Sequence, residues 1–178
     1  MPKRSEPKEL FRSHIFRLMQ TQVEFDNGSV LEAEYMDGNG GVMIVPVDAR
    51  GRILFIREYA VAVDGYPLGL PKGKLMEGED PAKCAMKELR EELGLKAARL
   101  EKLADLHVSP SYSKRHNHVF LARDLSEGKL QSGDEPEDVE VVPLTVAEAE
   151  EKIHSGELTE ARAIAGFYLA KRVLEADA

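Results

Sequence analysis

The segment Gly73–Leu95, GKLMEGEDPAKCAMKELREELGL, constrains the fold of this chain more than any other part of the sequence. Asp80 is a favourable N-cap, Pro81 suits the first helical position, and Gly94 supplies a C-terminal stop. These signals predict a helix from Asp80 to Leu93. Its apolar residues recur at helical spacing and form one stripe that must be buried against another element: Ala82, Ala85, Met86, Leu89 and Leu93.

Strand patterns lie on both sides of this helix. The run VMIVPV at Val42–Val47 is almost entirely apolar, which is typical of a strand covered on both faces. A polar turn leads into a second strand at Arg52–Tyr59. The remaining elements are expected to be strands at Leu100–Val108, His118–Leu125 and Val139–Val142, then helices at Val146–His154 and Thr159–Glu175. Because strands and helices alternate around a mixed sheet, the predicted fold class is α/β or α+β.

The beginning of the chain has a different pattern. Residues 1–9 are polar, contain two prolines and are expected to fray. Ile15–Phe25 has the pattern of a strand, and Val30–Tyr35 returns after the turn signal Asp26-Asn27-Gly28. A glycine-rich break follows, so the sequence predicts a small antiparallel β-hairpin region at residues 1–38 and a main domain at residues 39–178.

Charge and composition narrow the class of protein. The formal net charge of −8 argues against a partner made of long nucleic acid, because such binding requires basic surface. No apolar run approaches the roughly 20 residues that a membrane span needs. The start, MPKRSEPKEL, lacks the apolar core of a secretory signal, and the single Cys84 excludes an internal disulfide. A cytoplasmic protein without membrane partners is expected.

Three glutamates of the predicted helix carry the main chemical signal. Glu88, Glu91 and Glu92 stand at positions i, i+3 and i+4, so their carboxylates project from one side. Like charges crowded in this way are destabilising unless a cation lies among them, and oxygen ligands suit Mg²⁺ or Mn²⁺ rather than zinc. The alternative is a solvated acidic helix face, with its charge neutralised by nearby basic residues of the helix.

The spacing of the segment resembles the box motif of the Nudix hydrolase family. That motif reads glycine, five residues, glutamate, seven residues, arginine-glutamate, an apolar residue, any residue, two glutamates, any residue, glycine and an apolar residue. The matching positions here are Gly73, Glu79, Lys87, Glu88, Leu89, Glu91, Glu92, Gly94 and Leu95. Lys87 is the one departure. In the family an arginine there braces the first glutamate, here Glu79, so a slightly looser loop is expected.

The resemblance implies an α/β/α sandwich with a mixed sheet and a metal-dependent reaction. In the family, glutamates equivalent to Glu88 and Glu92 hold the metals, often with Glu91, and the carbonyl equivalent to that of Lys72 commonly joins them. The expected cofactor is therefore Mg²⁺ or Mn²⁺. The metals neutralise a pyrophosphate and lower the pKa of a water that attacks phosphorus.

Further residues resemble those of bacterial ADP-compounds hydrolases and ADP-ribose pyrophosphatases. Pro110 stands where ADP-ribose pyrophosphatases carry a proline, and Tyr112 stands where dinucleoside polyphosphate hydrolases carry a tyrosine. The chain reads Glu58-Tyr59-Ala60 where the pyrophosphatases often read Gln-Tyr-Arg, and Gly69 replaces a frequent glutamate. A substrate-binding arginine of the family is thus absent. Arg57 or Arg115 is a candidate replacement, and Tyr59 is a further substrate-binding candidate.

The acidic loop Gly133–Asp138 is the candidate source of a catalytic base. In the ADP-ribose pyrophosphatases the matching loop delivers a glutamate to the attacking water. The positional match favours Glu135, with Glu137 second and Glu91 of the helix as the remaining candidate. The alternative for this loop is ordinary solvated turn chemistry.

Taken with the resemblance, these residues imply hydrolysis of ADP-linked compounds such as ADP-ribose, diadenosine polyphosphates and NADH, with release of AMP. Two alternatives remain: an enzyme for another nucleoside diphosphate derivative, and a non-catalytic Nudix-fold ligand sensor. In related pyrophosphatases the N-terminal region pairs with a second subunit. Since two strands are too few to be stable alone, a homodimer is expected.

Overall fold

The computed structural model describes residues 1–128, 137 and 139–177. The chain divides into two compact units. The first consists of Met1–Gly40 with His107–His116, and the second consists of Gly41–Leu106 with Asn117–Ala178. In the described part of the chain, no helix has the length and apolar character needed to cross a membrane.

The first unit is an antiparallel sheet around β3 (Arg17–Glu24). On one edge β3 pairs with β4 (Val30–Asp37) along its whole length, as the hairpin pattern predicts. Its other edge is shared by β1 (Lys3–Arg4) and β2 (Lys8–Arg12). The expectation that residues 1–9 fray is therefore wrong for Lys3–Arg4 and for Lys8 and Glu9, whose backbones pair with β3.

The second unit contains two sheets. In the four-stranded sheet the order is β8 (Lys72–Lys74), β5 (Gly41–Pro46), β10 (His116–Glu127) and β9 (Leu95–His107). β5 runs parallel to β10 and antiparallel to β8, so this sheet is mixed, as expected. The three-stranded sheet is antiparallel, and its order is β11 (Glu140–Leu144), β6 (Ile53–Arg57) and β7 (Leu68–Gly69).

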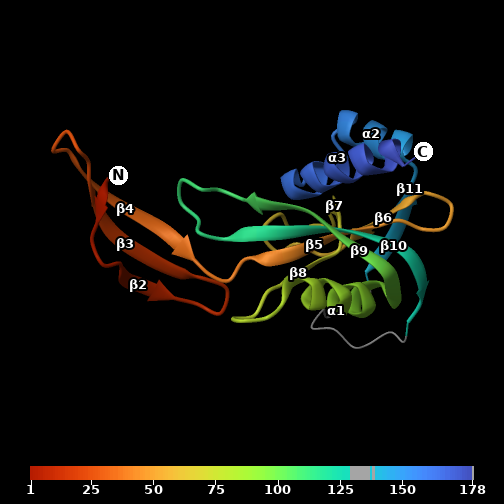
Figure 1. Ribbon diagram of the computed structural model, residues 1–178, viewed down its shortest axis with the longest axis horizontal. Coiled ribbons are helices and arrows are strands. Elements are labelled where there is room, and N and C mark those ends of the chain that lie inside the picture. Colours follow the sequence, from red (N-terminus) through yellow and green to blue (C-terminus); the bar gives the residue numbers. More distant parts are fainter. Residues whose placement is uncertain (129–136, 138, 178) are drawn as a thin grey trace. The chain divides into compact units, whose positions relative to one another are not determined.

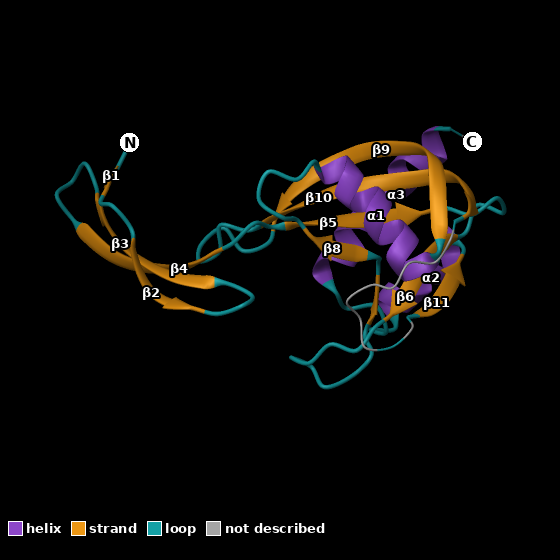
Figure 2. Ribbon diagram, turned by 90° about the horizontal axis from the view of Figure 1, so that it is seen from below, coloured by secondary structure: helices purple, strands orange, loops and turns teal. Residues whose placement is uncertain are grey.

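Helices cover both faces of the second unit. α1 (Pro81–Leu93) lies on one side, and α2 (Val146–His154) and α3 (Ala161–Ala176) lie on the other (Figures 1 and 2). On β5, Val42 and Ile44 pack in one core cluster with residues of α1, whereas Met43 and Val45 pack in a second cluster with residues of α3. Both faces of β5 are thus buried, which explains its apolar run. The architecture is an α/β/α sandwich, as predicted.

The predicted signals at the ends of α1 are present. The Asp80 carboxylate accepts hydrogen bonds from the N–H groups of Ala82 (2.8 Å) and Lys83 (3.1 Å). Gly94 ends the helix in the left-handed conformation, with φ of 64°. The buried face differs from the predicted stripe, because Ala82 is exposed and the face consists of Cys84, Ala85, Glu88, Leu89 and Glu92. Glu88 and Glu92 therefore lie on the buried face of α1 together with its apolar residues.

Candidate active site

Glu88 and Glu92 lie on the buried face of α1, with only 7% and 8% of their surfaces exposed. They are four residues apart, so both carboxylates project from the same side of the helix. Removing a carboxylate from water is costly unless the group is paired, hydrogen-bonded or bound to a metal. Such a pair on one buried face is characteristic of a functional site rather than of a solvated helix surface.

Gly73 on β8 makes room for Glu88. A Cβ atom built at Gly73 would overlap with the Cγ, Cδ and Oε1 atoms of Glu88. No side chain other than that of glycine fits at this position while the Glu88 carboxylate stays in place. The glycine that begins the box therefore lets the helix carboxylate lie directly against the strand backbone.

Among the described residues, Glu92 is held by a hydrogen bond at one carboxylate oxygen only. Its Oε1 accepts a hydrogen bond of 3.2 Å from the backbone N–H of Lys72. Its Oε2 is buried and has no hydrogen-bond partner among the described residues. Burial raises the pKa of Glu92 to about 8; the positive charge of Lys72 opposes this rise, and the carboxylate of Glu58 adds to it. A buried, incompletely satisfied carboxylate beside other carboxylates is a good fit for a cation that prefers oxygen ligands.

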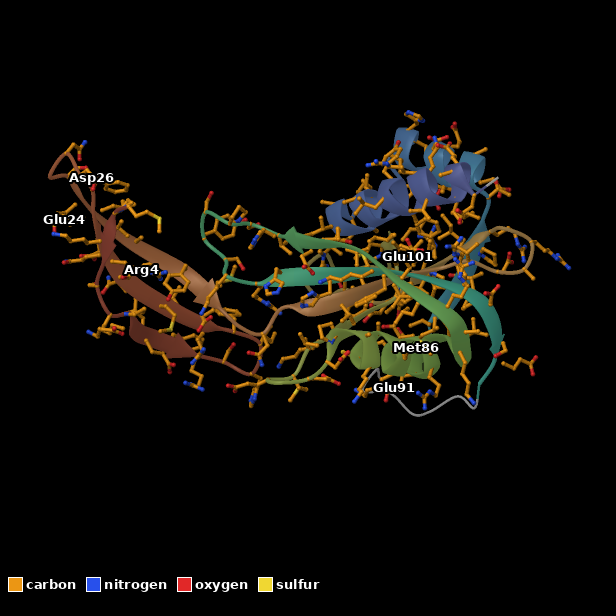
Figure 3. The ribbon with its side chains drawn as sticks, viewed as in Figure 1. Arg4, Glu24, Asp26, Met86, Glu91 and Glu101 are labelled. Carbon is orange, nitrogen blue, oxygen red and sulfur yellow. The ribbon has the colours of Figure 1, made fainter. Side chains whose placement is uncertain are left out.

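Glu91, on the same helix (Figure 3), is paired with Lys87. The Lys87 Nζ lies 3.3 Å from Glu91 Oε2 and 3.7 Å from Glu88 Oε1. Glu79 is the residue that Lys87 was expected to brace. Its carboxylate accepts a hydrogen bond of 2.9 Å from the N–H of Met76. Among the described residues, no three His, Cys, Asp or Glu side chains converge on one point. For Glu91 and Glu88 to bind the same cation, the Glu91 carboxylate would have to leave its ion pair with Lys87.

Cys84 completes the buried face of α1. Its Sγ lies 3.6 Å from the carbonyl oxygen of Lys74. Burial raises the pKa of the thiol to about 12, and the carboxylates of Glu79 and Glu88 act in the same direction. The thiol therefore stays protonated and contributes to packing rather than to nucleophilic chemistry.

Glu58 is a charged residue of this region that the sequence motifs do not place among the site candidates. It follows β6 directly, and its carboxylate forms an ion pair with the Nζ of Lys72. Lys72 in turn donates its backbone N–H to Glu92, so Glu58 is connected to the buried carboxylates through one residue. The sequence marks this position only by having Glu58 where the related pyrophosphatases often carry a neutral glutamine.

The acidic loop is described only at Glu137, because Glu135 lies outside the described residues. The Tyr66 hydroxyl donates a hydrogen bond of 2.6 Å to Glu137 Oε1, and this bond raises the pKa of Tyr66. The Tyr66 ring meets the ring of Tyr59 edge-on at 5.5 Å. The Tyr59 hydroxyl donates to the carboxylate of Asp64 at 2.8 Å. Tyr59 and Glu137 are thus connected through Tyr66.

The two candidate arginines have different surroundings. Arg57 forms an ion pair with Glu157 and donates a hydrogen bond of 3.2 Å to the carbonyl of Tyr66. Arg115 belongs to the first unit, where its side chain lies against Gly38. Arg57 is therefore committed to contacts within the protein, which weakens its candidacy for binding substrate.

Pro110 and Tyr112 also belong to the first unit, in its His107–His116 segment. The Tyr112 side chain is exposed, and its carbonyl accepts a hydrogen bond of 2.8 Å from the N–H of Met36 at the end of β4. This segment is thereby joined to the N-terminal sheet.

Several known proteins are similar to this chain over most of its length. Residues 39–164 match the NUDIX domain model. The chain is 33% identical to the ADP-ribose pyrophosphatase of Bacillus subtilis (strain 168), over 87% of this chain and 84% of that protein. It is 34% identical to the ADP compounds hydrolase NudE of Escherichia coli (strain K12), over 92% of this chain and 88% of that protein. A crystal structure of an ADP compounds hydrolase matches with a TM-score of 0.90 and 31% identity, covering 99% of this chain and 95% of that one.

Proposed function

The chain belongs to the NUDIX family and is a pyrophosphohydrolase, and from this premise we propose that it hydrolyses ADP-linked compounds to release AMP. The proposed substrates are ADP-ribose, diadenosine polyphosphates and NADH. The observation that carries the proposal is the pair of buried carboxylates on α1, one of them packed on the box glycine. The similarity to an ADP-ribose pyrophosphatase and an ADP compounds hydrolase supports this substrate class.

We propose Mg²⁺ as the cofactor, with Mn²⁺ as a substitute. Glu88 and Glu92 would hold the ion, with Glu91 and the carbonyl of Lys72 as further ligands. When bound, the ion would neutralise the pyrophosphate and acidify the attacking water. The unpartnered buried oxygen of Glu92 and the all-oxygen donor set support this assignment.

A panel of ADP-ribose, diadenosine triphosphate, NADH and a sugar nucleotide with another base tests the substrate class. We expect AMP among the products of the first three compounds in Mg²⁺, and no turnover in excess EDTA. The melting temperature of the substrate-free protein should also rise with Mg²⁺ concentration, because an ion bound only to the folded state stabilises it. Full activity in EDTA, or turnover of the other sugar nucleotide alone, would refute the proposal.

We propose that Glu135 accepts the proton of the attacking water, with Glu137 as the second candidate and Glu91 as the third. Glu135 and Glu137 come first because a carboxylate that binds a metal retains little basicity, so Glu91 would act as the base only when it does not bind the ion. We expect Glu135→Gln to lower kcat by roughly a hundredfold or more with little change in KM, and Glu137→Gln to have a milder effect. Steady-state kinetics of both variants decide this. If only Glu137→Gln loses activity, the role belongs to Glu137, and if neither does, Glu91 is the next candidate.

We also propose that the protein is a cytoplasmic homodimer formed through its N-terminal sheet. The first unit exposes several large apolar side chains, which is typical of an interaction surface: Leu10, Phe11, Ile15, Phe25, Val30 and Leu31. Sedimentation should give about 40 kDa, twice the 19.8 kDa of the chain. Phe11→Glu should shift the equilibrium toward monomer, whereas Val61→Glu, at an exposed residue of the second unit, should not. A fully active monomer at micromolar concentration would contradict the prediction.

A further inference from the structure

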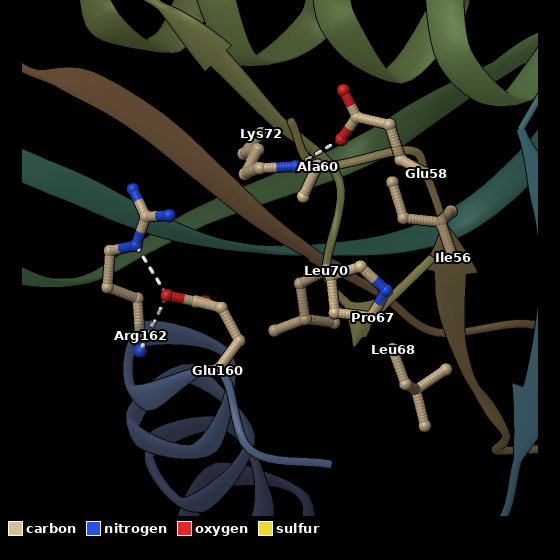
Figure 4. A pocket seen from close by; sticks show the side chains of 10 residues that line it. Ile56, Glu58, Ala60, Pro67, Leu68, Leu70, Lys72, Glu160 and Arg162 are labelled. Carbon is tan, nitrogen blue, oxygen red and sulfur yellow. Dashed lines mark hydrogen bonds and ion pairs between the residues drawn. The ribbon is translucent and has the colours of Figure 1, made fainter. Parts of the chain in front are cut away.

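The second unit contains a pocket beside the box, lined by side chains to which the proposed mechanism gives no role (Figure 4). It holds about 110 Å³, which is well below the roughly 300 Å³ or more of pockets that take drug-sized ligands. The residues that line it come from the end of β6 and the segment after it, from β7 and the residues on either side of it, from the residue before the box and from the start of α3: Ile56, Glu58, Ala60, Pro67, Leu68, Gly69, Leu70, Lys72, Glu160 and Arg162. A pocket of this size accommodates one small ring of a substrate rather than a whole dinucleotide.

Two ion pairs and an apolar wall define the chemistry of this pocket. Glu58 is paired with Lys72, and Glu160 Oε1 accepts from Arg162 Nε at 2.7 Å. These four side chains are each about a quarter to a third exposed, so a ligand in the pocket can reach them. Their charges cancel in pairs, and apolar side chains fill the remaining wall (Figure 4).

This arrangement favours hydroxyl groups over a phosphate. A phosphate entering the pocket would gain no net attraction, because Lys72 and Arg162 are each already paired with a carboxylate that would repel it. A hydroxyl group both donates and accepts, so adjacent sugar hydroxyls can donate to a carboxylate and accept from a cation at the same time. The apolar wall suits the carbon face of a sugar ring. The capping of α3 agrees with this, because Glu160 already satisfies the N–H groups of Arg162 and Ala163, which an anion would otherwise bind.

The pocket adjoins the proposed site of pyrophosphate cleavage. Lys72 lines the pocket with its side chain, and its backbone N–H contacts the buried Glu92. Two positions where the sequence lacks a charged family residue, Ala60 and Gly69, line the same pocket. A Cβ at Gly69 would meet no atom within 4 Å, so this part of the pocket is open. A ring bound here would be attached directly to the pyrophosphate.

We propose that this pocket binds the hydroxyl groups of a substrate ribose, with Glu160 and Arg162 as specificity-determining residues. The ion pair of Glu58 with Lys72 lines the same pocket, opposite the ion pair of Glu160 with Arg162. The assignment rests on the proposed function, because it requires an ADP-linked substrate at the box. Such substrates carry a ribose on each side of the pyrophosphate, and the experiment distinguishes between the two.

The test compares three substrates: ADP-ribose, its analogue with a methyl group in place of the second sugar, and its analogue with 2′,3′-dideoxyadenosine. Arg162→Ala and Glu160→Gln are measured with each, and Glu160→Gln keeps an oxygen to cap α3. For ADP-ribose we expect kcat/KM to fall by about tenfold to a hundredfold in both variants, the usual range for a lost hydrogen bond to a charged group. For the analogue that lacks the recognised sugar hydroxyls, the variants should match the wild-type protein within twofold.

The analogue that is insensitive to the variants identifies which ribose occupies the pocket. Arg172→Ala provides the matched control, because Arg172 is an exposed arginine of the same helix outside the pocket, and it should leave all three rates unchanged. Melting temperatures of all variants report whether they fold. Equal losses on all three substrates, or no loss on any, would overturn the pocket assignment while leaving the proposed function intact. If the wild-type protein cleaves none of the three, the proposed function and the assignment fail together.

Discussion

Replacing Glu92 with glutamine is expected to lower kcat by roughly a thousandfold, the largest effect of any single change considered for this protein. Glutamine has nearly the same size, so the packing of α1 should be preserved. It removes the negative charge of a carboxylate whose Oε2 is buried without a partner among the described residues. A bound metal would contribute several kcal/mol of charge stabilisation to a reaction at phosphorus, and a neutral ligand would hold the ion more weakly.

The same substitution is expected to stabilise the metal-free protein at alkaline pH. The pKa of Glu92 is raised by burial from 4.5 to about 8, so the folded state keeps a proton that the unfolded state releases. The free energy of unfolding should therefore fall as the pH rises from about 4.5 to about 8. Above that range the folded protein bears the full cost of a buried, ionised Glu92. Glutamine avoids this penalty. Since one pKa unit corresponds to about 1.4 kcal/mol, half of the shift already predicts about 2 kcal/mol in favour of Glu92→Gln at pH 9.

Both results are measured on the same samples, with steady-state kinetics in Mg²⁺ and denaturant unfolding in EDTA at pH 5 and pH 9. Glu77→Gln is the matched control, because Glu77 is an exposed glutamate of the same segment and should change neither quantity. A Glu92→Gln variant with near-normal kcat would remove Glu92 from the catalytic site. A Glu92→Gln variant that loses activity without gaining stability at pH 9 would show that the ionised Glu92 carboxylate does not destabilise the metal-free protein.

Replacing Gly73 with alanine is expected to lower kcat by roughly a hundredfold, because a displacement of about 1 Å at a catalytic group has consequences of that order. The added Cβ would occupy the space of the Glu88 carboxylate, so that side chain must move. The φ angle of Gly73 is not positive, so alanine itself fits the backbone and the collision with Glu88 is the specific defect. Overpacking of this kind also destabilises a protein by about 1–3 kcal/mol.

Kinetics and Mg²⁺ titration by calorimetry check this prediction, with weaker ion binding expected alongside the lower kcat. Gly65→Ala is the matched control, because the nearest atom to a Cβ there is 3.8 Å away and its φ is not positive either. A Gly73→Ala variant with wild-type kcat and ion affinity would mean that Glu88 can leave its position without cost, and hence that its contact with Gly73 does not organise the site.

Much of the fold could be predicted from the sequence, because its signals are local. The caps of α1 lie within one turn of the helix they bound, and the apolar run of β5 reports directly that both faces are covered. The spacing of the box glutamates likewise follows from the helical repeat, which places Glu88 and Glu92 on one face. These features depend on neighbours a few residues apart, so the amino-acid sequence alone was enough to predict the family and the α/β/α architecture.

The tertiary structure decided which groups meet across the chain. The ion pair of Glu58 with Lys72 spans 14 residues, and that of Arg57 with Glu157 spans 100 residues. Arg57 was a substrate-binding candidate by sequence, yet the fold brings Glu157 to it. The pocket that holds Arg162 depends in the same way on α3 meeting β6 and β7. Periodicity and capping report the local backbone conformation, whereas long-range pairs follow from strand order and helix packing, which no short segment encodes by itself.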